Sequence, residues 1–171
     1  MAINDLEYQG MTFVNTPTEL TPEARVGIAT TLNVLLADMF ALYVKTKNFQ
    51  WHMSGPRFRD YHLLLDEQAE QIFATTDVMA ERVRRLGGMA LGSIGQIANL
   101  QRVRGNDADH PIPAALLAEL QRDNKDLTRR FRKLHAACDE YGDVATSILV
   151  QIWIDESERR THLLSEAIRN D

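Results

Sequence analysis

Apolar residues at helical spacing run through most of this chain, and this pattern constrains its fold more than any other feature. They recur every three or four residues, as on the buried face of an α-helix, and no stretch shows the alternation expected of a strand. The pattern is broken at Ser54-Gly55-Pro56, Gly87-Gly88 and Gly142, where glycine and proline end helices. The sequence therefore predicts an all-α fold.

The first two long helices are predicted at about 21–53 and 58–86. Thr21 can cap the free N–H groups of the first turn, and Pro22 suits the first helical position. The predicted buried face of the first helix is Ile28, Leu32, Leu35, Met39, Leu42, Thr46, Phe49 and Met53. That of the second is Phe58, His62, Leu65, Ala69, Ile72, Thr76, Met79, Val83 and Leu86. The short joint predicts an antiparallel hairpin.

Two further helices are predicted at about 113–138 and 144–168. The fourth helix owes its apolar content to Ile148, Leu149, Ile152, Trp153 and Leu163. A long connection at 89–113, with a short helix at 93–100, separates the second long helix from the third. This is the connectivity of a ferritin-like four-helix bundle with a long crossover between helices 2 and 3. We divide the chain into an N-terminal extension, 1–20, and a bundle domain, 21–171.

Composition and charge exclude several classes of protein. The chain has 171 residues, a formal net charge of −5 and a single cysteine, Cys138. It can therefore form no internal disulfide and no cysteine-based zinc site, as expected in a reducing cytoplasm. We expect no signal peptide, and no membrane span, because the most apolar stretch, 32–44, is short and contains Asp38.

Four residues of the second helix form a candidate metal site. His62 and Asp66, and likewise Asp77 and Glu81, are separated by four residues, which places each pair one turn apart. At 100° per residue the four positions fall at about 0°, 40°, 60° and 100°, on one face beside the apolar stripe. Carboxylates with an imidazole and no thiolate suit iron, manganese or zinc.

The spacing of these residues requires a second copy of the chain. Asp66 and Asp77 lie about 16 Å apart along the helix axis, whereas ligands of one metal must be within about 4 Å of each other. Two copies of the helix, antiparallel about a two-fold axis, would bring residue 66 of one chain to residue 77 of the other. We therefore hypothesise two equivalent metal sites across a dimer interface.

Simpler interpretations remain open at this point. His62 could be a core histidine, and the acidic residues could form surface pairs with Arg82, Arg84 or Arg85. Glu158 and His162 on the fourth helix are a second candidate pair, which could face His62 or simply be solvated. The repeated Glu-x-x-His motif of intrasubunit di-iron centres is absent from the sequence.

Several motifs together resemble the Dps family, the mini-ferritins that protect DNA in starved bacterial cells. They are residues 48–56, 62–66, 77–82 and 86–88. The resemblance extends from about residue 20 to the end. It implies a hollow homo-dodecamer built from two-fold dimers, which oxidises Fe(II), preferentially with hydrogen peroxide, and stores the ferric product.

The resemblance also implies the roles of individual residues. His62 and Asp66 of one subunit, with Asp77 and Glu81 of another, match the family's iron ligands at the ferroxidase site. Gln50 stands where the family usually has a ligand histidine, so the alternative is a metal-binding shell with impaired ferroxidase activity.

Two neighbours of Gln50 also bear on the site. His52 should face away from the side of the helix that Gln50 faces, because two residues turn a helix by about 200°; local unwinding at 54–55 could instead bring it in. In the family, Trp51 lies beside the metal and can donate electrons; it could equally be an interface anchor.

Two further features concern iron entry and DNA. By the same resemblance, Asp139, Glu140 and Asp143 could line a three-fold pore, although Asp143 could instead cap the fourth helix. The first 24 residues contain no Lys or Arg, and twelve subunits would carry a charge of about −60, so direct DNA binding is expected to be weak or absent. We expect a bacterial cytoplasmic protein, with nucleoid association open.

Overall fold

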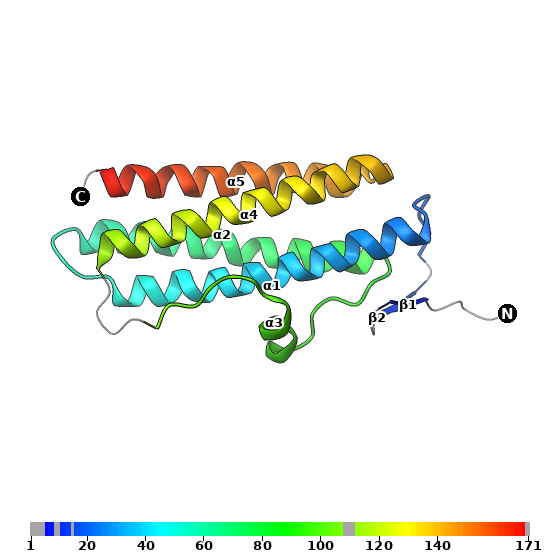
Figure 1. The fold of residues 1–171 in the computed structure, drawn as a ribbon, viewed down its shortest axis with the longest axis horizontal. Coiled ribbons are helices and arrows are strands. Elements are labelled where there is room, and N and C mark those ends of the chain that lie inside the picture. Colours follow the sequence, from blue (N-terminus) through cyan, green and yellow to red (C-terminus); the bar gives the residue numbers. More distant parts are fainter. Residues whose placement is uncertain (1–5, 9–10, 15, 108–111, 170–171) are drawn as a thin grey trace.

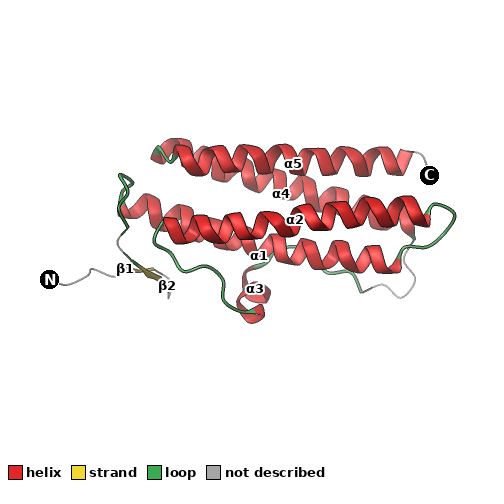
Figure 2. Ribbon diagram, turned by 180° about the vertical axis from the view of Figure 1, so that it is seen from behind, coloured by secondary structure: helices red, strands yellow, loops and turns green. Residues whose placement is uncertain are grey.

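The computed structural model, which describes residues 6–8, 11–14, 16–107 and 112–169, contains four long antiparallel helices (Figure 1). They are α1 (Pro22–His52), α2 (Phe58–Arg85), α4 (Pro113–Tyr141) and α5 (Val144–Arg169). The short helix α3 (Ile94–Leu100) lies in the crossover, on one side of the bundle (Figure 2). The predicted all-α, ferritin-like architecture is confirmed.

The four long helices form two hairpins. Helix α1 packs mainly on α2, and α4 mainly on α5. The crossover runs the length of the bundle, so that α4 begins at the end where α1 finishes (Figure 1). This crossover therefore lets α4 and α5 close the bundle over the α1–α2 hairpin.

The helix ends follow the local signals in the sequence. The Thr21 hydroxyl accepts a hydrogen bond from the backbone N–H of Ala24 at 3.2 Å, and Pro22 is the first helical residue. Gly55, Gly87 and Gly142 all have positive φ angles, of 96°, 89° and 71°. Residues with a Cβ rarely adopt this conformation, which explains why glycine stands at these turns.

A two-stranded hairpin precedes the bundle, which the sequence analysis did not anticipate. Strand β1 (Leu6–Tyr8) pairs antiparallel with β2 (Met11–Phe13). Strands of three residues are too short for alternation to be visible in the sequence. Phe13 is buried, and a Cβ on Gly88 would lie 3.1 Å from its ring. Residue 13 thus packs on the bundle, while the domain boundary at 20/21 stays a prediction.

Parts of the predicted N-terminal extension, 1–20, and of the predicted bundle domain, 21–171, lie outside the described residues.

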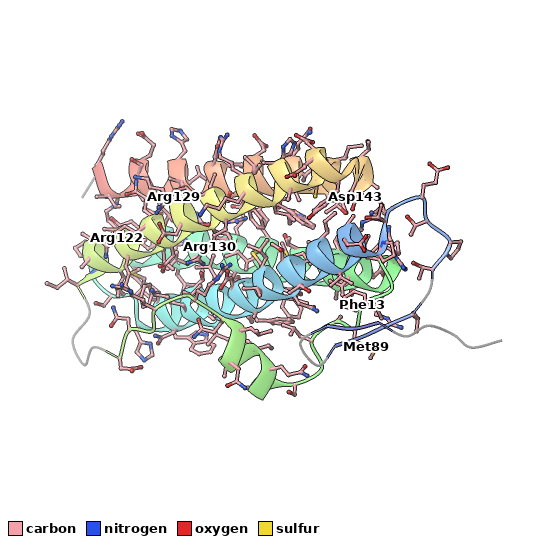
Figure 3. The ribbon with its side chains drawn as sticks, turned by 45° about the vertical axis from the view of Figure 1, so that its right-hand side comes forward. Phe13, Met89, Arg122, Arg129, Arg130 and Asp143 are labelled. Atoms are coloured by element: carbon pink, nitrogen blue, oxygen red, sulfur yellow. The ribbon has the colours of Figure 1, made fainter. Side chains whose placement is uncertain are left out.

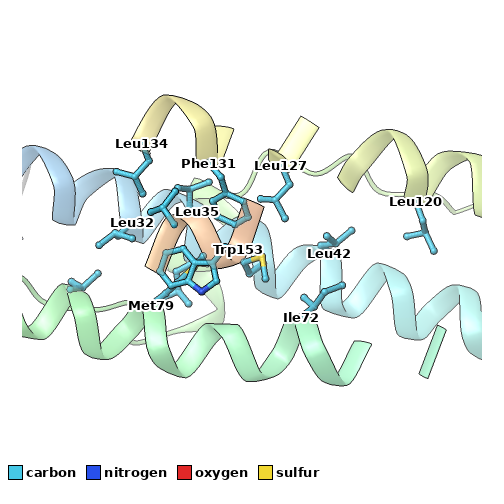
Figure 4. Close-up of a cluster of buried hydrophobic side chains, with 14 of the residues drawn as sticks. Leu32, Leu35, Leu42, Ile72, Met79, Leu120, Leu127, Phe131, Leu134 and Trp153 are labelled. Atoms are coloured by element: carbon cyan, nitrogen blue, oxygen red, sulfur yellow. The ribbon is translucent and has the colours of Figure 1, made fainter. Parts of the chain in front are cut away.

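The core lies between the two hairpins, where side chains from all four long helices meet (Figure 4). Its centre includes Leu32, Leu35, Leu42, Ile72, Met79, Leu120, Leu127, Phe131, Leu134 and Trp153. The predicted face of α2 was wrong at Phe58, which is exposed, and His62 is only partly buried. On α5, for which no face was predicted, Ile148 and Ile152 are exposed. Phe58 lies in the first turn of α2, and the apolar residues of α5 are divided between a buried and an exposed face.

A buried carboxylate attaches the crossover to the bundle. Asp38 of α1 is fully buried and accepts hydrogen bonds from the backbone N–H of Arg102, at 2.7 Å, and from its guanidinium. Arg130 of α4, which is labelled in Figure 3, also donates to Asp38, at 3.1 Å. One carboxylate therefore joins α1, the crossover and α4.

Among the described residues, α1 alone is long and apolar enough to pass a test for a membrane-spanning helix. More than half of its most apolar window is buried inside the bundle. Core helices of soluble proteins pass the same test, and α1 packs on α2, α3 and α4.

Candidate metal site

Gln50 and His62 meet between the last turn of α1 and the first turns of α2. Gln50 is 2% exposed. Its Nε2 lies 3.5 Å from His62 Nε2 and donates a long hydrogen bond, 3.4 Å, to the backbone carbonyl of His62. The two helices cross here because the joint between them is short, which brings the end of one to the start of the next.

Two buried polar atoms of this pair have no hydrogen-bond partner. They are Gln50 Oε1 and His62 Nδ1. A buried polar atom without a partner costs about 1–3 kcal/mol, so such atoms are uncommon unless they bind something. His62 is therefore not a satisfied core histidine. Gln50 Oε1 and either nitrogen of the His62 ring have the chemistry of metal donors.

Asp66 completes the group one turn further along α2. Its Oδ1 is 2.9 Å from the ammonium of Lys47, and its side chain is 44% exposed. The hydrogen bond from Lys47, followed by that from Gln50, holds the pKa of Asp66 below its usual value. Asp66 is therefore a carboxylate at neutral pH, available to a cation that can compete with Lys47.

The sequence analysis missed Lys47. Its position three residues before Gln50 places it on the same side of α1, so helical spacing could have indicated it. It contributes a positive charge beside the three donors, and any metal bound by Asp66 must share or displace that contact.

Asp77 and Glu81 lie further along the same, unbroken helix. Both are exposed, and Glu81 pairs with Arg85 at 2.9 Å, as the simpler interpretation expected for a surface acid. Because α2 is continuous, the separation of about 16 Å between Asp66 and Asp77 holds in the folded chain. Within the described part of one chain, no three His, Cys, Asp or Glu side chains come close enough to hold a metal.

The residues beside Gln50 face outward. Trp51 is 65% exposed. His52 is exposed and its Nδ1 lies 2.8 Å from the carbonyl of Asn48 in its own helix. The expectation that Gln50 and His52 face different directions is confirmed, and α1 does not unwind to bring His52 in.

The other candidate residues have different partners. Glu158 is paired with Arg132, and His162 is exposed. Asp143 is buried; it caps α5 by accepting from the backbone N–H of Thr146 at 3.0 Å and pairs with Arg82 at 2.7 Å. Asp143 is thus a structural residue.

The other two residues that were predicted to line a pore lie at the same turn, between α4 and α5. Asp139 and Glu140 are exposed, and Asp139 contacts His135 and Ser147. Their part in a pore stays a prediction.

An apolar surface lies on the same two helices as the candidate ligands. Along α1 it includes Phe40, Val44 and Trp51, and on α2 it includes the half-exposed Phe73, whose ring lies 5.0 Å from that of Tyr43. With α3, the α1 residues line a groove of about 580 Å³. We call Val44, Trp51 and Phe73 the ligand-side apolar patch.

Known proteins resemble this chain in sequence and in fold. The ferritin-like domain family matches residues 29–171. A DNA protection during starvation protein of Agrobacterium fabrum is 32% identical over 133 residues, which cover 77% of this chain and 82% of that protein. DpsC from Streptomyces coelicolor has a solved structure with a TM-score of 0.86, 30% identity and coverage of 91% of both chains.

The chain belongs to the Dps family. A low temperature-induced protein of Nostoc sp. is another relative, 35% identical over 150 residues, or 87% of this chain and 84% of that protein. Membership in the Dps family makes this chain an iron-binding mini-ferritin in general terms.

Proposed function

We propose that this Dps protein oxidises Fe(II), preferentially with hydrogen peroxide, at sites shared by two subunits, and stores the ferric product inside a dodecameric shell. In the overall reaction, two Fe(II) ions each lose one electron. One hydrogen peroxide molecule takes up both electrons and two protons and gives two water molecules. Iron is here the substrate and the stored product.

The observation that carries this proposal is the incomplete donor group at the start of α2. Gln50 Oε1 and His62 Nδ1 are buried without partners beside the Asp66 carboxylate. Three donors leave an iron ion without a full set of ligands. The carboxylates of Asp77 and Glu81 have the right chemistry to complete it, but only from a second chain.

The surroundings of the donor group favour a second chain of the same kind. The ligand-side apolar patch of Val44, Trp51 and Phe73 is exposed in the single subunit. Patches of this sort next to polar residues mark protein interfaces. In an antiparallel pair of α2 helices, the patch residues would be buried and Asp77 and Glu81 would reach the partner's His62 and Asp66.

Each candidate site residue then has a proposed role. His62, Asp66 and Gln50 bind iron from one subunit, while Asp77 and Glu81 bind it from the other. Trp51, at the rim of the patch, is proposed as the nearby electron donor. Lys47 holds the Asp66 carboxylate in place until iron arrives.

Mixed assemblies test the sharing of sites directly. One variant, His62→Ala with Asp66→Ala, removes one half of every site; the other, Asp77→Ala with Glu81→Ala, removes the second half. Each alone should lack peroxide-dependent Fe(II) oxidation above the rate in buffer. Random co-assembly makes about half of the pairs mixed, each with one intact site of two, so about a quarter of wild-type sites should return. Sites built within one chain would return no activity, which would refute the proposal.

The alternative function is a metal-binding shell with impaired ferroxidase activity. The contact of Gln50 Nε2 with the His62 ring favours this alternative. The N–H side of the amide, rather than its oxygen, lies where an iron ligand is expected. If wild type oxidises iron no faster than buffer and Gln50→His does, the alternative holds.

We also propose that direct DNA binding is weak or absent, and that the protein acts in the bacterial cytoplasm. Removing Fe(II) and peroxide together would protect DNA without contact. An electrophoretic shift of plasmid DNA at low salt would contradict this part of the proposal.

A further inference from the structure

The donor group of this chain contains one nitrogen donor and several oxygen donors. His62 provides the imidazole, whereas Gln50 and Asp66 provide a carboxamide and a carboxylate. His52 provides no second imidazole, since it is exposed and contacts its own helix at Asn48. Asp77 and Glu81 of a second copy would add only oxygen.

We propose that Gln50 is a specificity-determining residue that selects against Zn²⁺ in favour of Mn²⁺ and Fe²⁺. This inference rests on the proposed function, since it requires that the site binds divalent metals. Imidazole ligands favour zinc and copper, whereas carboxylate and carbonyl oxygens suit manganese. A carboxamide in place of a second imidazole therefore lowers Zn²⁺ affinity more than Mn²⁺ affinity.

The position of Gln50 fits a ligand of the metal that His62 binds. Its amide can turn by 180°, which exchanges Oε1 and Nε2 and leaves the backbone unchanged. Oε1 would then occupy the place 3.5 Å from His62 Nε2, the ring nitrogen that faces Gln50, and the turn gives up only the long hydrogen bond from Nε2 to the His62 carbonyl. Two ligands around an ion at about 2.1 Å lie about 3.0–3.4 Å apart in octahedral or tetrahedral geometry, so this separation needs little adjustment.

The burial of Gln50 makes its carbonyl oxygen an effective donor. The side chain is 2% exposed, and Oε1 has no hydrogen-bond partner in the subunit. A bound cation would give this atom its missing interaction. A carboxamide oxygen is a harder donor than an imidazole nitrogen, however, so it binds Zn²⁺ more weakly than a second imidazole would.

Selection against zinc has a consequence for the proposed reaction. Zn²⁺ undergoes no redox chemistry, so a zinc ion in the site would exclude iron and stop oxidation there. With Gln50 in place of a histidine, the site thus binds iron less tightly, but zinc competes with iron less strongly.

Metal titration of the assembled protein tests the inference without reference to activity. Zn²⁺ is titrated into the metal-free protein by calorimetry, and free Mn²⁺ is followed by electron paramagnetic resonance. Gln50→His should raise Zn²⁺ affinity by about tenfold or more, as changes around metal ligands do, and Mn²⁺ affinity by less than about threefold. An unchanged ratio of the two affinities overturns the inference.

Two further variants keep the test informative. His52→Gln replaces an imidazole by a carboxamide two residues away from Gln50. It should change neither the Zn²⁺ affinity nor the Mn²⁺ affinity. Gln50→Leu removes the oxygen at similar volume and should weaken Mn²⁺ binding; unchanged Mn²⁺ binding would show that Gln50 is no ligand. Circular dichroism and the assembled mass verify that each variant folds and assembles.

His62→Ala separates the inference from the proposed function. If it leaves metal binding unchanged, the metal binds elsewhere and both fail. If it abolishes binding while Gln50→His leaves the Zn²⁺ to Mn²⁺ ratio unchanged, only the inference fails.

Discussion

Phe73 should be central to the two-fold pairing of subunits. It lies on the same face of α2 as the four candidate ligands, about 20° from His62 around the helix. Along the helix it is close to the midpoint between Asp66 and Asp77, where the two-fold axis of an antiparallel pair would pass. Half of its side chain, 51%, is exposed in the single subunit.

The exposed half of the ring gives the size of the expected effect. Complete burial of a Phe side chain contributes about 1.5–3 kcal/mol, so burying the exposed half contributes about 1 kcal/mol per subunit. Both copies act at the same axis, which makes about 2 kcal/mol for Phe73→Ala. This corresponds to a dimer dissociation constant about 30-fold higher.

Mass photometry or sedimentation velocity over a dilution series measures the change. Ile148→Ala is the matched control, because Ile148 is equally exposed, at 53%, but lies on α5. It should leave two-fold pairing and metal stoichiometry unchanged. If Phe73→Ala pairs as tightly as wild type, α2 does not form the interface and the shared-site hypothesis fails with it.

Three further predictions follow from buried groups. Asp38→Ala leaves the Arg102 backbone N–H without its acceptor and should cost about 3 kcal/mol, or about 6–12 °C in Tm, measured by calorimetry; a change below about 2 °C would contradict the anchoring role. Burial raises the pKa of the Cys138 thiol to about 12, so iodoacetamide at pH 8 should label it only after unfolding. Burial also raises the pKa of Glu156 above its usual value; the folded state then binds this proton more tightly than the unfolded state, so stability from this group rises as the pH falls through the raised pKa. Glu156→Gln should remove that pH dependence in urea unfolding at pH 4 to 7, and an unaltered profile would refute the assignment.

Local signals in the sequence determined the ends of the helices. Thr21 caps α1, and Gly55, Gly87 and Gly142 stand at the turns with positive φ. Capping and turn formation depend on the sterics and hydrogen bonding of a few adjacent residues. The helix count, the long crossover and the family followed from these signals and from residues 48–88. The grouping of His62 with Asp66, and of Asp77 with Glu81, followed from the period of a helix.

The tertiary structure alone decided which side chains meet across helices. It paired Lys47 with Asp66 and Arg82 with Asp143, and it left Gln50 Oε1 without a hydrogen-bond partner. It also decided which apolar face of α5 is buried and where Phe13 packs. These contacts join residues from 19 to 75 positions apart in the chain, as with Lys47 and Asp66 or Phe13 and Gly88. Their geometry depends on how whole helices cross, which no short stretch of sequence specifies.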